Sequence, residues 1–368
     1  MAKERRKRSP AGPLNILFVQ DFPCIRNYKM ATALRSCGHR VTLAYMSAPL
    51  SRVYEGLSDD TYDACIQLSS CRHLWDLSAE FDIVHCHNEP DHLTVAALAG
   101  SAPVVHDTHD LISLRASGDK RLAFFEGIAN RGSDGRIYCT EGLQEEANEL
   151  YGVEGPSIVF RNYALKADLP RTARDKLSAT DGKTHVVYEG SIGGGGHRDF
   201  VDLFADMSRY GVHIHVYPTL FDEGLARVLR EFETIHYHRP KSPKVIIEEM
   251  TQYDVGIIPF NVQKGNKRFL DTSIANKFYE YLAAGLPILA SSLHSYGQLL
   301  DEYPVGDTFL TADEAVSKLA KLTQIARTTD LTRYVKTYED EIGAVVALYR
   351  SVISGAKTRL GHHACIAE

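Results

Sequence analysis

The residues best suited to chemistry lie in one stretch, residues 254–291, which reads DVGIIPFNVQKGNKRFLDTSIANKFYEYLAAGLPILAS. Its pattern predicts a buried strand over 255–259, a cationic loop, a helix over 275–284 and a second strand from Pro287. A helix that starts near a strand end offers unpaired backbone N–H groups and the positive end of its dipole. The turn before Ala275 is therefore a predicted seat for phosphate.

Four charged residues of this stretch are candidates for function. Lys267 and Arg268 precede the predicted helix and could stabilise a negatively charged leaving group. Lys277 and Glu280 are three positions apart and so share one face of the helix. A solvent-facing ion pair on an ordinary helix is the simple alternative. Their place after a strand, where open α/β sheets bind ligands, favours a binding role.

The segment DVGIIPF...NKFYEYLAAGLPILA resembles the donor-binding motif of retaining nucleotide-sugar glycosyltransferases of family 4. The resemblance implies the GT-B fold, an α/β architecture of two facing Rossmann-like domains with an interdomain cleft and a C-terminal helix that crosses back to the first domain. It further implies that Glu280 hydrogen-bonds the ribose of the donor, with Lys277 beside it. Thr272 stands where many members carry a second Glu that contacts the transferred sugar.

A glycine-rich loop, GSIGGGGH, follows the strand predicted around Val187. Gly193, Gly194 and Gly195 would let backbone N–H groups approach a phosphate, and Arg198 would add positive charge. A flexible hinge is the alternative. The spacing fits neither G-x-G-x-x-G nor the Walker sequence, which argues against a nicotinamide-dependent oxidoreductase and an ATP site.

Polar residues also follow the predicted strands of the first half. His109 and Asp110, in the run HDTHD, resemble the His-acid pair of the family, whose His is expected near the donor sugar; we predict a catalytic role for His109. Arg26, His87 and Asp110 are predicted to lie on the acceptor side. The histidine spacing does not complete a tetrahedral set, so no metal site is expected and the reaction is predicted to be metal-independent.

The order of the predicted elements divides the chain into domains. We expect a disordered basic tail over 1–13, an acceptor-binding Rossmann-like domain over 14–163 and a polar linker over 164–183. A nucleotide-sugar-binding Rossmann-like domain over 184–335, a crossover helix over 336–354 and a tail over 355–368 would follow.

Composition agrees with a two-domain globular protein, because the chain has 368 residues, of which 44% are hydrophobic and 24% charged. A net charge of −6 argues against a nucleic-acid binder. Seven cysteines without paired metal spacing fit a reducing, cytoplasmic setting. No apolar run predicts a membrane span. The basic N-terminal tail lacks a signal-peptide core and predicts at most weak peripheral contact with anionic lipid.

The resemblance to family 4 implies a glycosyltransferase, which we expect to move a hexose from a UDP-, GDP- or dTDP-sugar to the hydroxyl of a small-molecule, glycan or lipid-linked acceptor. The donor is a substrate, and no cofactor is expected. Retention of anomeric configuration follows from the resemblance. Two alternatives stay open: a nucleotide-sugar epimerase of the same fold, which needs no acceptor, and a non-catalytic protein that binds the nucleotide sugar without turnover.

Overall fold

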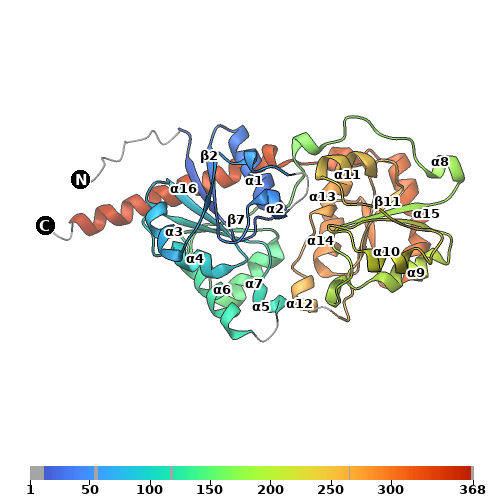
Figure 1. Cartoon of the computed structure of the whole chain (residues 1–368), viewed down its shortest axis with the longest axis horizontal. Helices are drawn as coiled ribbons and strands as arrows, with labels where there is room; N and C mark the ends of the chain where they lie inside the picture. Colours follow the sequence, from blue (N-terminus) through green and yellow to red (C-terminus); the bar gives the residue numbers. More distant parts are fainter. Residues whose placement is uncertain (1–11, 54–56, 117–118, 265, 366–368) are drawn as a thin grey trace.

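Two α/β domains lie side by side in the computed structural model, which describes residues 12–53, 57–116, 119–264 and 266–365 (Figure 1). The first domain holds a parallel sheet of order β3-β2-β1-β4-β5-β6-β7. Its central strands are buried along nearly their whole length, as expected for a parallel sheet covered on both faces. Its strands are β1 (Asn15–Val19), β2 (Arg40–Tyr45), β3 (Ala64–Gln67), β4 (Ile83–His87), β5 (Val104–Thr108), β6 (Gly135–Tyr138) and β7 (Ser157–Val159).

Helices connect these strands in the alternating order that the hydrophobic pattern predicts. The helix α1 packs against β2, and α4 packs against β4 and β5. The helices are α1 (Ile25–Ser36), α2 (Leu50–Val53), α3 (Cys71–Ser78), α4 (Asp91–Ala97), α5 (Ile112–Arg115), α6 (Lys120–Gly132) and α7 (Glu141–Tyr151).

The second domain repeats the architecture with a parallel sheet of order β10-β9-β8-β11-β12-β13. Its strands are β8 (His185–Glu189), β9 (His213–Tyr217), β10 (Ile235–Tyr237), β11 (Val255–Ile258), β12 (Ile288–Ser291) and β13 (Gly306–Phe309). Its helices are α9 (Val201–Ser208), α10 (Glu223–Leu229), α11 (Pro243–Met250), α12 (Lys267–Leu270), α13 (Lys277–Ala283), α14 (His294–Glu302) and α15 (Ala312–Thr328).

The chain crosses between the domains twice, and the two crossings touch. The linker contains the 3₁₀ turn Lys166–Asp168 and the short helix α8 (Ser178–Asp181). Ala164, on the way out, forms a parallel bridge with Thr337, on the way back. Aromatic rings fill the junction, where Phe160 meets Tyr338 at 5.1 Å and Tyr163 meets Tyr279 at 5.2 Å between ring centroids. This packing holds the two domains together.

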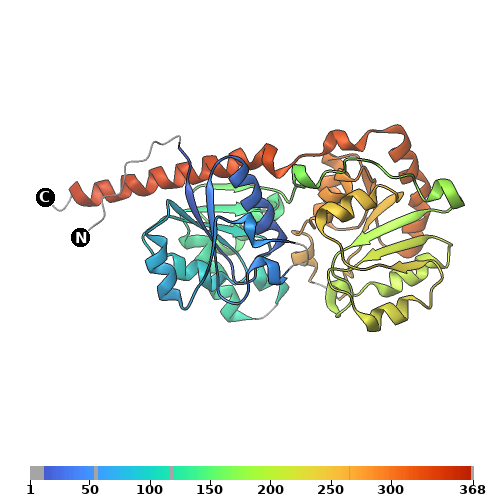
Figure 2. The ribbon, with the colours of Figure 1, turned by 45° about the horizontal axis from the view of Figure 1, so that its top comes forward.

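The long helix α16 (Tyr338–Cys365) returns to the first domain, as predicted. Figure 2 shows it running along that domain, where it contacts α1, β6 and β7. The hydroxyl of Tyr349 on α16 is hydrogen-bonded to Nδ1 of His85 on β4. The helix is longer than predicted, since it extends beyond Ser354 into residues expected to form a tail.

Three other boundaries differ from the predictions. The strand β11 ends at Ile258, one residue earlier, because Pro259 has no N–H for the ladder. The helix α13 begins only at Lys277 rather than Ala275. Lys267 and Arg268 lie in the short helix α12 rather than in a loop, because the Asn266 side chain accepts a hydrogen bond from the backbone N–H of Arg268 and caps the turn.

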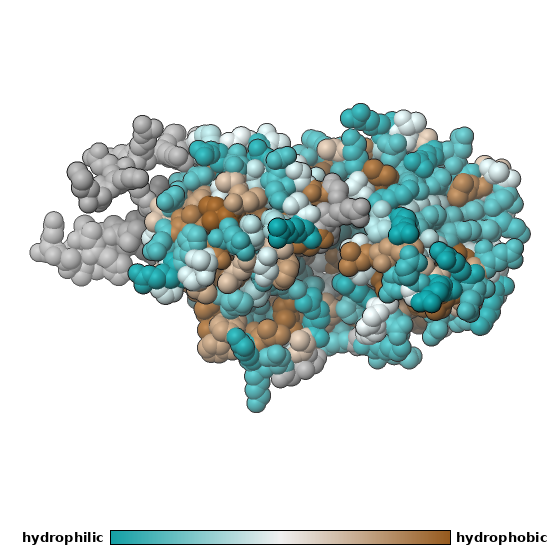
Figure 3. Space-filling model, in the orientation of Figure 1, coloured by the Kyte–Doolittle hydropathy of each residue, from teal (hydrophilic) through white to brown (hydrophobic). Residues whose placement is uncertain are grey.

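The surface in Figure 3 is mostly hydrophilic over the second domain, and hydrophobic residues gather in patches on the first. Within the residues that the structure describes, no helix is long and apolar enough to cross a membrane. Most of the predicted basic tail, residues 1–11, lies outside the described residues, so its proposed contact with lipid stays a prediction.

Gly135, at the start of β6, tests how closely α16 is seated. A Cβ atom there would lie 2.7 Å from Cγ2 of Val352 on α16. We therefore expect Gly135→Ala to lower the free energy of unfolding by about 1–3 kcal/mol, because the helix must shift. Urea unfolding followed by circular dichroism measures this.

Gly343→Ala is the matched control. Gly343 lies within α16, and a Cβ atom there would have nothing within 4 Å. This variant should be unchanged or more stable by about 1 kcal/mol, through helix propensity alone. Equal destabilisation by both substitutions would contradict the close packing of α16.

Candidate functional site

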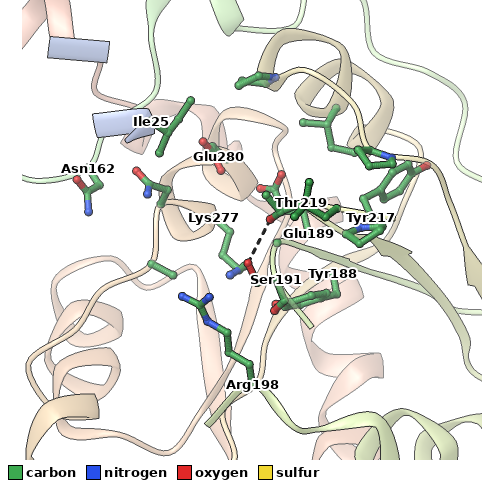
Figure 4. A pocket seen from close by; sticks show the side chains of 18 of the residues that line it. Ile25, Asn162, Tyr188, Glu189, Ser191, Arg198, Tyr217, Thr219, Lys277 and Glu280 are labelled. Atoms are coloured by element: carbon green, nitrogen blue, oxygen red, sulfur yellow. Dashed lines mark hydrogen bonds between the residues drawn. The ribbon is translucent and has the colours of Figure 1, made fainter. Parts of the chain in front are cut away.

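A cavity of about 1010 Å³ lies between the two domains (Figure 4). Side chains from the carboxyl ends of β8 and β9 and from the start of α13 form much of its second-domain wall. The carboxyl ends of parallel strands are where open α/β sheets bind ligands. Its first-domain wall is formed by Ile25, Val53, Leu57, His109, Asp110 and Asn162.

Lys277 and Arg198 are two of the second-domain cations that line this cavity; Arg239 and Lys241 also line it, but each of these is paired with a carboxylate. Figure 4 shows Lys277, from α13, and Arg198, from the end of the glycine-rich loop, directed toward the same space. Within the described part of the chain, neither forms a salt bridge with a carboxylate. Lys277 Nζ lies 5.1 Å from the centroid of the Tyr188 ring. The two cations are therefore free to bind an anionic ligand.

Gly190 makes room for the lysine. Its φ is +117°, and a Cβ atom there would come 3.1 Å from Lys277 Nζ. Burial lowers the pKa of Lys277 to about 8, although the neighbouring Glu189 opposes this shift. The amine is thus still protonated at neutral pH, but it titrates within an accessible range.

Glu280 is held by a lysine of the other domain. Lys29 Nζ, on α1, donates a 2.7 Å hydrogen bond to Glu280 Oε1. The Lys29 side chain has no exposed surface, and that of Glu280 is 9% exposed. A buried ion pair of this kind costs desolvation, and loss of one partner leaves an uncompensated charge. This contact fixes Glu280 at the rim of the cavity and joins the domains.

A second carboxyl, Glu189 at the end of β8, is hydrogen-bonded to Glu280. Burial raises the pKa of Glu189 well above its usual value, and the adjacent Glu280 raises it further. Burial would also raise the pKa of Glu280, but Lys29 and the bond from Glu189 lower it overall. Glu189 is therefore the protonated partner and Glu280 the ionised one.

The first-domain wall rests on a buried carboxylate, Asp107, at the end of β5. Arg26 binds both of its oxygens, with Nε 2.9 Å from Oδ2 and Nη2 3.1 Å from Oδ1. His85, His87 and His109 place ring nitrogens 3.4, 3.4 and 3.5 Å from Oδ2. Burial would raise the pKa of Asp107, but Arg26 and His109 hold it well below its usual value.

Of the three histidines around Asp107, His109 is the one whose protonated form is favoured. Its Nδ1 lies 3.6 Å from Sγ of Cys24, the residue that caps α1. Burial would lower the pKa of His109, but Cys24 and Asp107 raise it well above the usual value. Burial would raise the pKa of the Cys24 thiol, but His109 lowers it overall. The His109 ring therefore faces the cavity with its protonated form favoured by Asp107 and Cys24 behind it.

Asp110 lies beside His109 on the cavity wall. Ser273 Oγ donates a 3.3 Å hydrogen bond to its Oδ1, so this residue too bridges the domains. Burial raises the pKa of Asp110 to about 6, and the nearby Glu89 adds to the rise. Its carboxyl therefore changes charge near neutral pH and could accept a proton from a hydroxyl.

The structure thus brings five predicted site residues to one cavity. They come from both domains and from segments about 170 residues apart in the sequence: His109, Asp110, Arg198, Lys277 and Glu280.

Lys267 and Arg268 are not among the residues that line it. Lys267 Nζ is paired with Asp271, one turn along the chain. Arg268 crosses to the other domain and is paired with Glu146 and Glu149 on α7. Both side chains are exposed and already paired with carboxylates, so neither is placed to contact a ligand in this cavity.

Thr272 also points away from the cavity. Its Oγ1 donates to the carbonyl of Phe269 at 2.8 Å, and its own carbonyl accepts a 2.8 Å bond from Thr140 Oγ1. It is a domain contact, and its neighbours Ser273 and Ile274 face the cavity instead.

Gly193, Gly194 and Gly195, predicted to bind the donor, are not among the residues that line the cavity, although Ser191 before them and Arg198 after them are. Their φ angles are +82°, +72° and +80°, a left-handed region that other residues rarely adopt. This left-handed backbone turns the loop so that Arg198, at its end, lies in the wall of the cavity.

Two residues predicted on the acceptor side lie beneath the cavity surface. Arg26 is 2% exposed and is fully engaged with Asp107 and Asn162. His87 is 1% exposed, and its Nδ1 lies 3.2 Å from Nε2 of His109. Both therefore position the wall residues rather than contact a ligand.

Sequence reasoning missed Lys29, Glu189 and a stacked pair in the cavity, Arg239 over the Phe221 ring at 3.9 Å. A lysine among apolar residues in YKMATAL was a signal that α1 buries this cation. Nothing local marked Glu189 or the stacked pair, since their partners are far away in sequence.

A model described as Glycosyltransferase Family 4 matches residues 26–162. Sucrose-phosphate synthase from Thermosynechococcus elongatus superposes with a TM-score of 0.62 at 11% identity, covering 96% of this chain and 100% of that one. The chain has the GT-B fold. The predicted resemblance to GT-B enzymes of family 4 is thereby confirmed.

Other GT-B structures give the same result. HepE from Anabaena, in complex with UDP-glucose, has a TM-score of 0.64 at 12% identity, with 95% of this chain and 100% of that one covered. WaaG, a glycosyltransferase involved in lipopolysaccharide biosynthesis, has a TM-score of 0.58 at 14% identity, with 92% and 98% covered. The curated proteins gave no match. The family match covers the first domain of this GT-B chain, and the structural likeness covers both.

The Lys29–Glu280 ion pair generates a prediction on stability. Lys29→Met should lower the free energy of unfolding by about 3–5 kcal/mol, because it leaves the ionised Glu280 buried without its partner. Denaturant unfolding measures the change.

The double variant Lys29→Met with Glu280→Gln should recover much of this loss, since the unpaired charge is gone. Lys264→Met is the control, because Lys264 forms an exposed pair with Asp199; it should change stability by less than about 1 kcal/mol. Equal effects of the Lys29 and Lys264 variants would show that the buried pair does not couple the domains.

Proposed function

We propose that this GT-B protein is a glycosyltransferase that moves a sugar from a nucleotide diphosphate sugar to an acceptor hydroxyl. The observation that carries the proposal is the presence of Arg198 and Lys277, two cations that form no salt bridge with any described residue, beside the ionised Glu280 in one interdomain cavity. A nucleotide diphosphate needs cations for its phosphates and an acceptor for its ribose hydroxyls. HepE, which shares the fold, is described in complex with UDP-glucose, which supports this donor class.

The second domain would hold the donor. Arg198 and Lys277 would bind the diphosphate and stabilise the charge that builds on it as the glycosidic bond breaks. Glu280 would accept hydrogen bonds from the ribose, held in place by Lys29. The stacked side chains of Phe221 and Arg239 offer a flat surface for a base.

The first domain would hold the acceptor. His109 and Asp110 stand on the wall opposite Lys277, and Ile25, Val53 and Leu57 supply its apolar part. The His109 imidazolium would stabilise negative charge near the reacting centre, and Asp110 would accept the proton of the acceptor hydroxyl. Retention of configuration, transfer of a hexose and independence from metals and cofactors remain part of this proposal.

A binding experiment tests the donor site. Calorimetry with UDP, GDP, dTDP and their sugars should find at least one tight ligand. Arg198→Ala and Lys277→Met should each weaken it at least tenfold, about 1.4 kcal/mol, because a charge-assisted contact to phosphate is lost.

Lys267→Ala and Arg268→Ala are the matched controls, since both are exposed cations outside the cavity. Their affinities should stay within about twofold of wild type. If these two weaken binding and Arg198→Ala does not, the diphosphate lies at α12 and the proposed site is refuted.

The pKa of Lys277 gives a dependence on pH. Its ammonium form exists below about 8 and disappears above it, so affinity for the diphosphate should fall as pH rises. From about pH 7 to about pH 9 the charged fraction drops roughly tenfold, which sets the largest expected loss. Calorimetry at several pH values measures it, and Lys277→Met should abolish the dependence.

A further inference from the structure

A column of histidines lies outside the cavity, on one face of the second-domain sheet. Alternation along a strand places His213 and His215 on the same face of β9. The parallel register sets His185 of β8 opposite His213 and His236 of β10 opposite His215. His238, just after β10, extends the column.

The histidines are hydrogen-bonded to one another in a single direction. His185 Nδ1 lies 2.9 Å from His215 Nε2, and His215 Nδ1 lies 3.0 Å from His238 Nε2. Likewise His213 Nδ1 lies 3.0 Å from His236 Nε2. When every Nδ1 is the donor, all three bonds are satisfied. The near end of the column then presents His185 Nε2 and His213 Nε2, the two ring nitrogens at that end that form no bond within the column.

Asp181 stands at that end. Its Oδ2 lies 3.0 Å from His185 Nε2. One ligand atom each from Asp181, His185 and His213 falls within 4.8 Å of the others. We propose that these three residues form a binding site for a divalent transition-metal ion such as Zn²⁺. Two imidazoles and a carboxylate are a donor set that zinc accepts, with water as the fourth ligand.

The surroundings support ligation. A metal-bound histidine normally donates its other ring N–H to an acceptor that fixes its orientation. Here His215 and His236 are those acceptors for His185 and His213. Bonds of about 2.0–2.2 Å to a tetrahedral ion place ligand atoms about 3.4 Å apart. Atoms that now lie within 4.8 Å of one another must therefore move closer, which the exposed Asp181 permits.

A second group in the described chain, His85, His87 and Asp107, meets the same distance criterion. It is a poorer site, because Arg26 already occupies both oxygens of Asp107 and all three residues are buried. Asp181, by contrast, has a side chain that is 40% exposed, and among the described residues no arginine forms a salt bridge with it. An ion can reach it from solvent.

The site would fasten the interdomain linker. Asp181 ends α8, the last helix before β8, and Ser178 of the same helix donates to Asp254 Oδ1 at 2.6 Å. An ion held by Asp181, His185 and His213 would tie this helix to two strands. Metal bound only by the native state should therefore raise the melting temperature by mass action.

The test compares zinc binding by the full chain after removal of metal with EDTA. Wild type, Asp181→Asn and His213→Gln are dialysed against ZnCl₂, and bound zinc is counted by atomic emission. We expect wild type to hold one equivalent more than either variant and to gain thermal stability with zinc that both variants lack. His294→Gln, at an exposed histidine outside the column, should behave as wild type.

Equal zinc content and equal zinc-induced stabilisation in wild type and both variants would overturn the proposal. Zinc bound elsewhere, for example by cysteines, is present equally in wild type and variants and so cancels in the comparison. If a variant fails to fold in EDTA, the absorption spectrum of wild type loaded with Co²⁺ provides the test instead. Ligand-field bands without thiolate charge transfer support the site, and charge transfer from a cysteine refutes it.

Discussion

The buried contact between Lys29 and Glu280 is the interaction on which the rest of the site depends. It joins residues 251 positions apart and spans the two domains. A lysine without exposed surface is stable only beside an anion, and an anion at that depth needs the lysine. The pair also determines the state of Glu189, because two adjacent carboxyls cannot both ionise and Lys29 favours ionisation of Glu280. One ion pair thus contributes to the contact between the domains and fixes the position of a ligand-facing carboxylate and the protonation of its neighbour.

The opposite wall of the cavity likewise depends on a buried charge, the carboxylate of Asp107, and on the cations that surround it. Arg26 forms a buried salt bridge with that carboxylate, and His109 contacts the same carboxylate from the cavity side. His85 carries the support outward to Tyr349 on α16, which explains how a helix from the end of the chain takes part in the first domain. The charged residues that face the cavity are therefore the ends of buried networks. Their orientation is fixed before any ligand arrives, which is the condition for electrostatic stabilisation of a reacting centre.

The sequence predicted the fold well and the site in part. Alternation of apolar strands with amphipathic helices indicated two parallel sheets, and the DVGIIPF segment located β11, α13 and β12 to within two residues. Glu280 was found through the family resemblance, Lys277 because it shares a helix face with Glu280, and Arg198 because it ends the glycine-rich loop; all three follow strands, whose ends converge on one edge. Lys267 and Arg268 satisfied the same reasoning, but their partners Asp271, Glu146 and Glu149 could not be foreseen. A free cation and a paired one look identical until the opposing carboxylates are placed.

What the sequence determined by itself was therefore local: the order of strands and helices, the glycines that permit a left-handed loop, and the residue types at strand ends. These follow from backbone geometry and from periodic burial, which act over a few residues. Tertiary structure alone decided that Lys29 meets Glu280, that five histidines align across β8, β9 and β10, and that Arg26 and His87 are buried beneath the wall. Charge, protonation and exposure depend on neighbours brought together by folding, and those neighbours are scattered along the chain.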